Sequence, residues 1–241
     1  MTTDIPPAPE PLTLVIFGAS GATGKAAVRQ ARARGHRVRA VDHSLPAYPT
    51  DDPQVTRIAA DVLTDDLRVH VRGADAVLSC LGVGRDAKTL LSPPPLYTQG
   101  TRAICAAMEA EGVARLVVIS ASFVATANRG PLWFKLPAMA GLARVFDQMA
   151  EMEAELHDHP AILWTAVRPG WLMEGVETGD YVVQPDVIPS DMIRTRHADL
   201  AHFMVRLAET QDWLRQTPAI ARLEAPSASS PAAVASELFG I

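Results

Sequence analysis

The chain has 241 residues, of which 48% are hydrophobic and 20% charged, and its formal net charge is −5. This is ordinary globular composition at a length that suits one α/β domain. The sequence holds no basic run and no apolar stretch near the ~20 residues that span a bilayer, which argues against nucleic-acid and membrane partners.

The first eleven residues contain four prolines and neither a basic nor an apolar run. We therefore expect residues 1–11 to be a disordered leader and not a signal peptide, followed by a single domain over 12–241. The two cysteines, Cys80 and Cys105, lie in apolar runs and are expected to be buried and reduced. These features together predict a cytoplasmic protein.

In the first half of the chain, short apolar runs alternate with helical patterns. Strands are expected over 12–17, 36–41, 56–60 and 76–81, and helices over 22–34 and 64–71. Glycine follows both predicted helices, at Gly35 and Gly73, and a glycine in the left-handed conformation is a typical helix end.

The alternation continues in the second half. Helices are expected over 97–111, 142–157 and 198–208, and strands over 113–120 and 162–167. The irregular segment 171–194 holds one further strand around 181–183, and a last helix is expected to start at Ser230-Pro231.

Short connections between alternating strands and helices predict the fold class. We expect a Rossmann-type, doubly wound α/β fold, in which a mostly parallel sheet carries helices on both faces. A small C-terminal elaboration on the substrate side is expected, built mainly from residues 123–141 and 170–196.

The loop Gly18-Ala-Ser-Gly-Ala-Thr-Gly24 joins the first predicted strand to the first predicted helix. Glycine permits a tight turn and a close approach to phosphate, and a helix N-terminus supplies unpaired amides and a partial positive charge. The GxxGxxG spacing differs from the usual GxGxxG and fits neither a P-loop nor a nucleophile elbow. The expected contacts to the pyrophosphate of a nicotinamide dinucleotide are Gly18, Ser20, Gly21, Ala22, Thr23 and Gly24.

Asp42 lies 24 residues after Gly18, at the end of the second predicted strand. A carboxylate there can accept hydrogen bonds from the adenosine ribose, and it would repel a 2′-phosphate. Arg39 and His43 are close enough to bind a phosphate instead, and Asp42 could also be a solvated loop residue. The cofactor is therefore expected to be NAD or NADP, with Asp42 favouring NAD.

With these segments placed, the chain resembles the atypical short-chain dehydrogenase/reductase superfamily, in particular its NmrA-like and biliverdin-IXβ/flavin reductase branch. The resemblance spans 12–208 and rests on the order of the motifs. These are Gly18–Gly24, Asp61-Val62, Ala74-Asp-Ala-Val77, Leu81-Gly82, Gly100-Thr-Arg102, Gly112-Val113, Val117–Ser122, Val167-Arg-Pro169 and Ala198–Met204. The further cofactor contacts expected are His43, Asp61, Val62, Leu81, Gly82, Ser120 and Pro169.

Most members of the superfamily use a Tyr-x-x-x-Lys pair, in which the lysine lowers the tyrosine pKa so that the phenol protonates a substrate oxygen. Here the residues four positions after the three tyrosines are Asp52, Thr101 and Pro185. A flavin or quinone does not need that acid, because hydride can pass directly to a planar electrophile. The sequence thus predicts an NAD(P)H-dependent oxidoreductase with a planar small-molecule acceptor. The alternative is a non-catalytic, NmrA-like protein that senses the dinucleotide.

Ser120 and Ser122 end the fifth predicted strand, at the sheet edge where ligands bind. The resemblance implies a serine here against substrate or cofactor, so both are expected catalytic groups, although Ala121 can occupy that position and either hydroxyl can instead bond local backbone. Phe123 and Trp171 are expected to stack on the planar substrate or to pack within loops.

Two further expectations concern the surface and metals. The apolar segment 131–140 suggests a lid or an oligomer contact, which leaves a monomer or a homodimer open. The pairs His157/His159 and His197/His202 do not have the i, i+4 spacing of a zinc helix, so no metal site is expected.

Overall fold

The computed structural model describes residues 10–43, 52–84, 89, 92–126 and 137–229. The predicted helix at Ser230 lies outside these residues, as do most of the predicted leader and of the segment 131–140.

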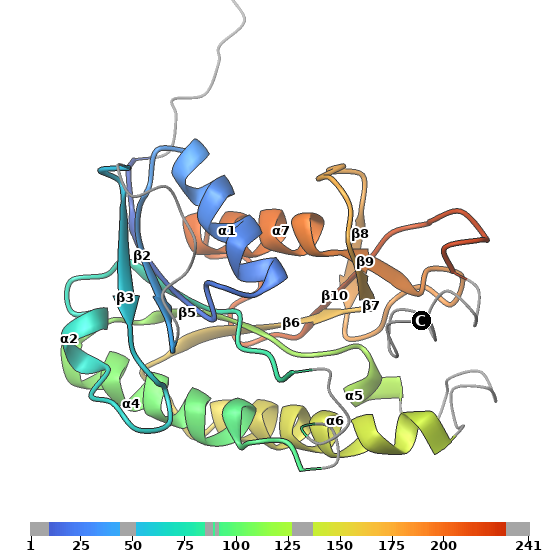
Figure 1. Ribbon diagram of the computed structural model, residues 1–241, viewed down its shortest axis with the longest axis horizontal. Coiled ribbons are helices and arrows are strands. Elements are labelled where there is room, and N and C mark those ends of the chain that lie inside the picture. Colours follow the sequence, from blue (N-terminus) through green and yellow to red (C-terminus); the bar gives the residue numbers. More distant parts are fainter. Residues whose placement is uncertain (1–9, 44–51, 85–88, 90–91, 127–136, 230–241) are drawn as a thin grey trace, which may run out of the picture.

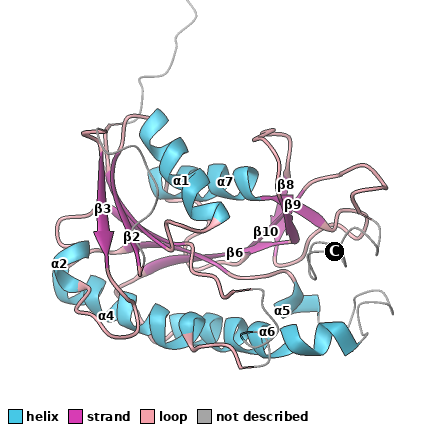
Figure 2. Ribbon diagram, in the orientation of Figure 1, coloured by secondary structure: helices cyan, strands magenta, loops and turns pink. Residues whose placement is uncertain are grey.

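An eight-stranded sheet forms the middle of the molecule, with the order β3-β2-β1-β4-β5-β6-β10-β8 (Figures 1 and 2). Its strands are β1 (Thr13–Phe17), β2 (Arg37–Asp42), β3 (Val55–Ala59), β4 (Ala76–Ser79), β5 (Arg115–Ile119), β6 (Leu163–Pro169), β8 (Val182–Pro185) and β10 (Pro218–Ala221). All neighbours are parallel except β8 and β10. The strand order reverses between β1 and β4, as in doubly wound folds, so the predicted fold class is confirmed.

Helices cover both faces of this sheet (Figure 1). One face carries α1 (Ala22–Ala33) and α7 (His197–Glu209), and the other carries α2 (Arg68–Val71), α4 (Thr101–Glu111) and α6 (Pro137–Leu156), with the short α5 (Phe123–Thr126) beside α6. Within the described ranges, no helix is both long and apolar enough to cross a membrane.

The two helical layers enclose two apolar cores because side chains alternate along each strand. On β1, Leu14 and Ile16 pack in the core with α1 and α7, whereas Val15 and Phe17 pack in the core with α4 and α6. All four side chains are fully buried. A strand buried on both faces explains why the sequence shows a continuous apolar run here instead of an alternating one.

Most predicted elements lie within two residues of their expected bounds, but two helices differ. The predicted helix over 64–71 is reduced to α2, because Asp61 accepts a hydrogen bond from the Leu63 N–H (2.9 Å) and Asp65 accepts one from the Asp61 N–H (2.9 Å). Such side-chain bonds favour a turn over a helix. The second helix that differs is α6, which begins at Pro137 and not at 142. Proline is tolerated in the first turn of a helix, because the N–H that it lacks would have no partner within the helix there.

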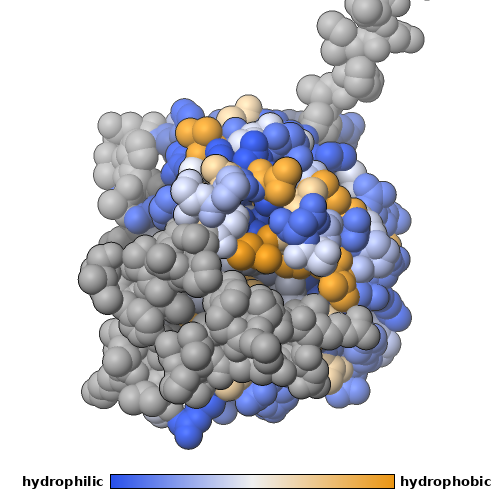
Figure 3. Space-filling model, turned by 90° about the vertical axis from the view of Figure 1, so that its right-hand side faces the viewer, coloured by the Kyte–Doolittle hydropathy of each residue, from blue (hydrophilic) through white to orange (hydrophobic). Residues whose placement is uncertain are grey.

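Three strands were not predicted. β10 lies between β6 and β8, and a separate parallel pair is formed by β7 (Trp171–Met173) and β9 (Arg194–Arg196). Each has three or four residues and pairs with a segment far away in sequence, so local patterns carry little information about it. The side of the molecule near these strands shows apolar residues gathered among polar ones (Figure 3).

Both cysteine thiols resist ionisation. Burial raises the pKa of Cys80 to about 12, and burial with the nearby Glu109 and Glu155 raises the pKa of Cys105 to about 12. Since the thiolate is the reactive form, we expect neither thiol to react with a chromogenic aromatic disulfide at pH 8 until the protein is unfolded in denaturant. Rapid release of the chromophore from the folded protein would contradict this prediction.

Candidate functional site

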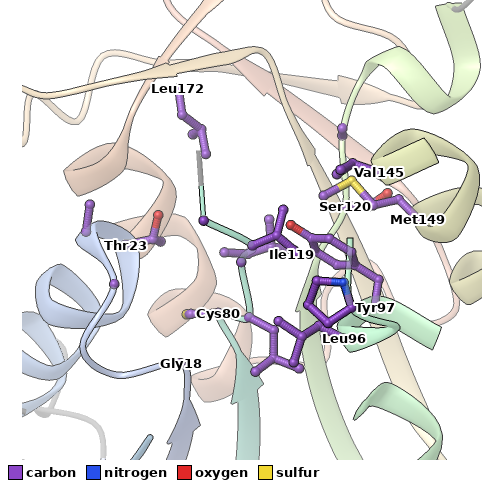
Figure 4. Close-up of a pocket in the computed structure, with 18 of the residues that line it drawn as sticks. Gly18, Thr23, Cys80, Leu96, Tyr97, Ile119, Ser120, Val145, Met149 and Leu172 are labelled. Atoms are coloured by element: carbon purple, nitrogen blue, oxygen red, sulfur yellow. The ribbon is translucent and has the colours of Figure 1, made fainter. Parts of the chain in front are cut away.

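A cavity of about 850 Å³ opens where the strand order reverses, and residues after the carboxyl ends of β1 to β6 line it. Its volume lies within the range of small-molecule sites, about 300–1,000 Å³. In Figure 4, Gly18 and Thr23 lie on one side, and Val145 and Met149 of α6 on the opposite side. The two sides thus come from the first and the second half of the chain.

Two glycines let α1 pack tightly against the sheet. Gly18 has a positive φ of 71°, and a Cβ placed on it would lie 2.4 Å from the carbonyl oxygen of Cys80. A Cβ on Gly24 would lie 2.1 Å from the carbonyl oxygen of Gly18. Gly24 does not line the cavity, so the prediction that it touches the cofactor is corrected to a packing role. The other five predicted loop residues do line the cavity: Gly18, Ser20, Gly21, Ala22 and Thr23.

The N-terminus of α1 suits an anion. Gly21 is the N-cap, with φ −70° and ψ 167°, and it makes no side-chain capping hydrogen bond. The first turn of this 12-residue helix contains no acidic side chain. Its amides and the positive end of the helix dipole therefore fit a pyrophosphate, and glycine at the cap lets that group approach the backbone.

Asp42 connects the end of β2 to the glycine loop. Its Oδ2 accepts the Ser20 N–H at 3.0 Å, and its Oδ1 lies 3.0 Å from His43 Nδ1. The carboxylate is buried and lines the cavity. Because a carboxylate can accept several hydrogen bonds, these contacts still leave it able to accept from the ribose hydroxyls.

The remaining predicted cofactor contacts on the first half of the sheet also line the cavity: Asp61, Val62, Leu81 and Gly82. A π-helical turn, η1 (Leu96–Gly100), packs next to them and runs into α4. A Cβ on Gly100 would lie 3.0 Å from Val62 Cγ2 and 3.2 Å from Leu81 Cδ1, so glycine permits this close packing.

The charge of the cavity lining is one-sided. The described lining residues include the acidic Asp42, Asp61 and Glu174 but neither lysine nor arginine, and their basic side chains are His43 and His197. His197, the first residue of α7, contacts the hydroxyl of Thr23 through Nδ1 at 2.8 Å. In the described part of the site, a phosphate away from the α1 N-terminus therefore meets no lysine or arginine.

The two predicted catalytic serines have different surroundings. Ser120 lines the cavity, and its hydroxyl donates to Glu153 Oε1 at 2.5 Å. Ser122 is fully buried, and its hydroxyl donates to the backbone carbonyl of Arg168 at 2.9 Å. The chain leaves the strand after Ile119 and turns into α5, so Ser122 does not line the cavity and its predicted catalytic role is corrected to a structural one.

Tyr97 on η1 is a cavity residue that the sequence did not indicate. Burial raises its pKa to about 12, so the phenol stays protonated at neutral pH and can donate a hydrogen bond. Tyr97 lies in a π-helical turn, and such turns are frequent at functional sites. The turn itself cannot be recognised from the sequence, so it gave no usable signal for Tyr97. Its raised pKa is the opposite of the lowered pKa in a Tyr-x-x-x-Lys pair.

An aromatic wall lines the other half of the cavity. The ring centroid of Phe123 lies 5.2 Å from that of Phe146 and 6.2 Å from that of Trp171, and all three residues line the cavity. Phe123 and Trp171 were predicted here, whereas Phe146 was not assigned a site role. Pro169 also lines the cavity, at the end of β6.

Across the described residues, no group of three or more histidine, cysteine, aspartate or glutamate side chains could hold a metal ion. His197 instead contacts Thr23, and His202 contacts the hydroxyl of Tyr181 at 2.7 Å. His157 packs edge-on against Trp164, with ring centroids 4.9 Å apart.

Residues 18–211 match the model of a family described as NAD(P)H-binding. An uncharacterised chloroplastic protein of Arabidopsis thaliana is 29% identical over 226 residues, which cover 89% of this chain and 78% of that protein.

Solved structures share the fold. The oxidoreductase ylbE of Lactococcus lactis has a TM-score of 0.72 and 19% identity, covering 95% of this chain and 97% of that one. A Streptococcus pneumoniae protein to which NADH-flavin reductase activity is attributed has a TM-score of 0.69 and 19% identity, covering 88% of this chain and 99% of that one. At this identity the likeness establishes the common fold.

Proposed function

The chain belongs to the NAD(P)H-binding family, and from this premise we propose that it is a reductase that passes hydride from NADH to an uncharged planar acceptor. Quinones and isoalloxazines are the acceptor classes that fit. Family membership agrees with the NAD(P)-binding Rossmann protein expected from the resemblance.

The observation that carries the proposal is the aromatic wall formed by Phe123, Phe146 and Trp171. Flat rings stack on such side chains, with a gain beyond the burial of apolar area. The cavity face of α6 also carries Val145 and Met149. This face can orient a planar acceptor and exclude water, and the α6 side chains described in the cavity lining are all apolar: Leu142, Val145, Phe146 and Met149.

The reaction then needs few groups from the chain. A reduced nicotinamide, when bound, would supply the hydride, and the α1 N-terminus and Asp42 would hold the other end of the dinucleotide. The aromatic wall would orient the acceptor ring, and this positioning would be the main contribution of the protein. The Tyr97 hydroxyl can donate a hydrogen bond to an acceptor oxygen, and solvent supplies the one proton that accompanies the hydride.

Charge favours an uncharged acceptor. The described cavity lining contains the acidic Asp42, Asp61 and Glu174, whose negative charges would repel the phosphate of a phosphorylated flavin. Lumiflavin and simple benzoquinones carry no such group.

The function is tested by following NADH oxidation with a neutral benzoquinone, lumiflavin and flavin mononucleotide. We expect turnover with the two neutral acceptors and a kcat/KM at least fivefold lower for the phosphorylated flavin. If NADH and NAD bind but no acceptor is turned over above the uncatalysed rate, the reductase proposal is wrong and the dinucleotide-sensor alternative is favoured.

Substitution of Trp171 or Phe146 by leucine is expected to raise the KM for the acceptor about fivefold, because an aromatic stack contributes about 1 kcal/mol. The Kd of NADH should stay within twofold. Trp213→Leu is the matched control, since Trp213 lines a different cavity. An unchanged acceptor KM in both site variants would show that the acceptor does not stack on this wall.

A further inference from the structure

A buried ion pair lies directly behind Ser120. Glu153 of α6 accepts hydrogen bonds from Arg168 of β6, with Nε at 2.9 Å from Oε1 and Nη2 at 2.6 Å from Oε2. About a tenth of each side chain is accessible to solvent. A carboxylate that pairs with a guanidinium through two such bonds acts as a hydrogen-bond acceptor.

This fixes the direction of the bond to Ser120. The 2.5 Å contact between Ser120 Oγ and Glu153 Oε1 contains one proton, and that proton belongs to the serine. A hydroxyl that donates its proton keeps lone pairs that can only accept. Because Ser120 lines the cavity, these lone pairs are what it can offer to a ligand.

We propose that Glu153 is a positioning residue that holds the Ser120 hydroxyl as a hydrogen-bond acceptor, so that the ligand group placed against Ser120 is an N–H donor. A serine hydroxyl without such a carboxylate partner could instead donate its proton to a carbonyl oxygen of the ligand. The ion pair with Arg168 is what removes this freedom.

The position of Ser120 limits which N–H groups can reach it. Its backbone N–H donates to the Val167 carbonyl at 2.7 Å, which places Ser120 beside Val167 and Arg168 near the end of β6 and away from Asp42 at the end of β2. Under the proposed function, this half of the cavity takes the nicotinamide and the acceptor. Two ligand groups could then supply the N–H donor for Ser120. One is the carboxamide N–H of the nicotinamide, and the other is the imide N–H of an isoalloxazine.

Two ligand pairs distinguish these sources by equilibrium binding. The first compares NADH with reduced 3-acetylpyridine adenine dinucleotide, whose acetyl group lacks the amide N–H. The second compares lumiflavin with 3-methyllumiflavin in the presence of NAD. In one of the two pairs we expect the N–H ligand to bind about tenfold more tightly, since a hydrogen bond left unmade by a buried group has about that cost.

The variants test Glu153 itself. In Ser120→Ala, and in the double variant Glu153→Leu/Arg168→Met, the affinity ratio of the selective pair should fall from about ten to about one. The double variant removes both charges together, which avoids a buried unpaired arginine. Arg168→Lys is the matched control, because it keeps a cation beside Glu153, and its ratio should stay near that of the wild type.

A purely structural role of the ion pair would weaken both ligands of a pair equally and leave the ratio unchanged. A ratio that persists in the double variant, or a wild-type ratio near one for both pairs, overturns the proposal. If thermal unfolding shows that the double variant does not fold, Glu153→Ala/Arg168→Ala decides, since it also removes the oxygen that accepts the Ser120 proton and its ratio must then fall. These are binding measurements, so a missing turnover with an intact ratio would contradict the proposed reductase function and not this inference.

Discussion

Asp42→Ala is expected to remove the preference for NADH over NADPH. In the native protein we expect this preference to be at least tenfold. The 2′-phosphate of NADPH would lie near the buried Asp42 carboxylate, and like charges about 4 Å apart repel by about 1–4 kcal/mol depending on the local dielectric. The alanine variant should also bind NADH more weakly, because it loses the acceptor for the ribose hydroxyls. Fluorescence titration of the native protein and the variant with both cofactors measures the two Kd ratios.

Asp42 also accepts the Ser20 N–H, so a second variant is needed to separate charge from loop support. Asp42→Asn keeps an oxygen that can accept this bond and loses the negative charge. We expect it to lose most of the discrimination while retaining most of the NADH affinity. Native protein that binds NADPH tenfold more tightly than NADH would contradict the assignment of Asp42 as the residue that selects the cofactor.

Gly24→Ala is expected to lower the free energy of unfolding by about 3 kcal/mol, at the upper end of the usual cost of overpacking. The new Cβ would lie 2.1 Å from the Gly18 carbonyl oxygen and 2.8 Å from the Ala19 Cα, and backbone atoms cannot turn aside as a flexible side chain can. For a domain of this size the loss corresponds to a fall in Tm of roughly 6–12 °C, measurable by circular dichroism. NADH binding should weaken as well, because α1 must shift from the loop.

Gly82→Ala is the matched control for that substitution. Gly82 lines the same cavity, but apart from its chain neighbours no described residue has an atom within 4 Å of a Cβ placed on it, so the Tm of this variant should stay close to that of the native protein. Native-like melting of Gly24→Ala would mean that α1 lies farther from the glycine loop than in this structure.

The parts of the site that could be predicted from sequence are short segments of consecutive residues at the ends of strands. The glycine loop, Asp42 and the pair Leu81-Gly82 each lie at the carboxyl end of a buried strand, and these ends meet at one edge of the sheet. Ser122 was also expected at this edge but is not among the residues that line the cavity. The strand ends at Ile119, and where the chain turns, the alternation of side chains no longer says which hydroxyl faces the cavity.

Sequence alone determined the order of the strands from β1 to β6 and of the helices between them, the glycine loop and the acidic residue at the end of β2, because apolar periodicity and turn-forming residues act over short distances along the chain. Only the tertiary structure decided that Glu153 and Arg168 meet behind Ser120, that Tyr97 enters the cavity and that Phe146 joins Phe123 and Trp171. These contacts join segments far apart in sequence, and it is the packing of α6 and η1 at the sheet edge that brings them together. No local pattern of residues records that packing.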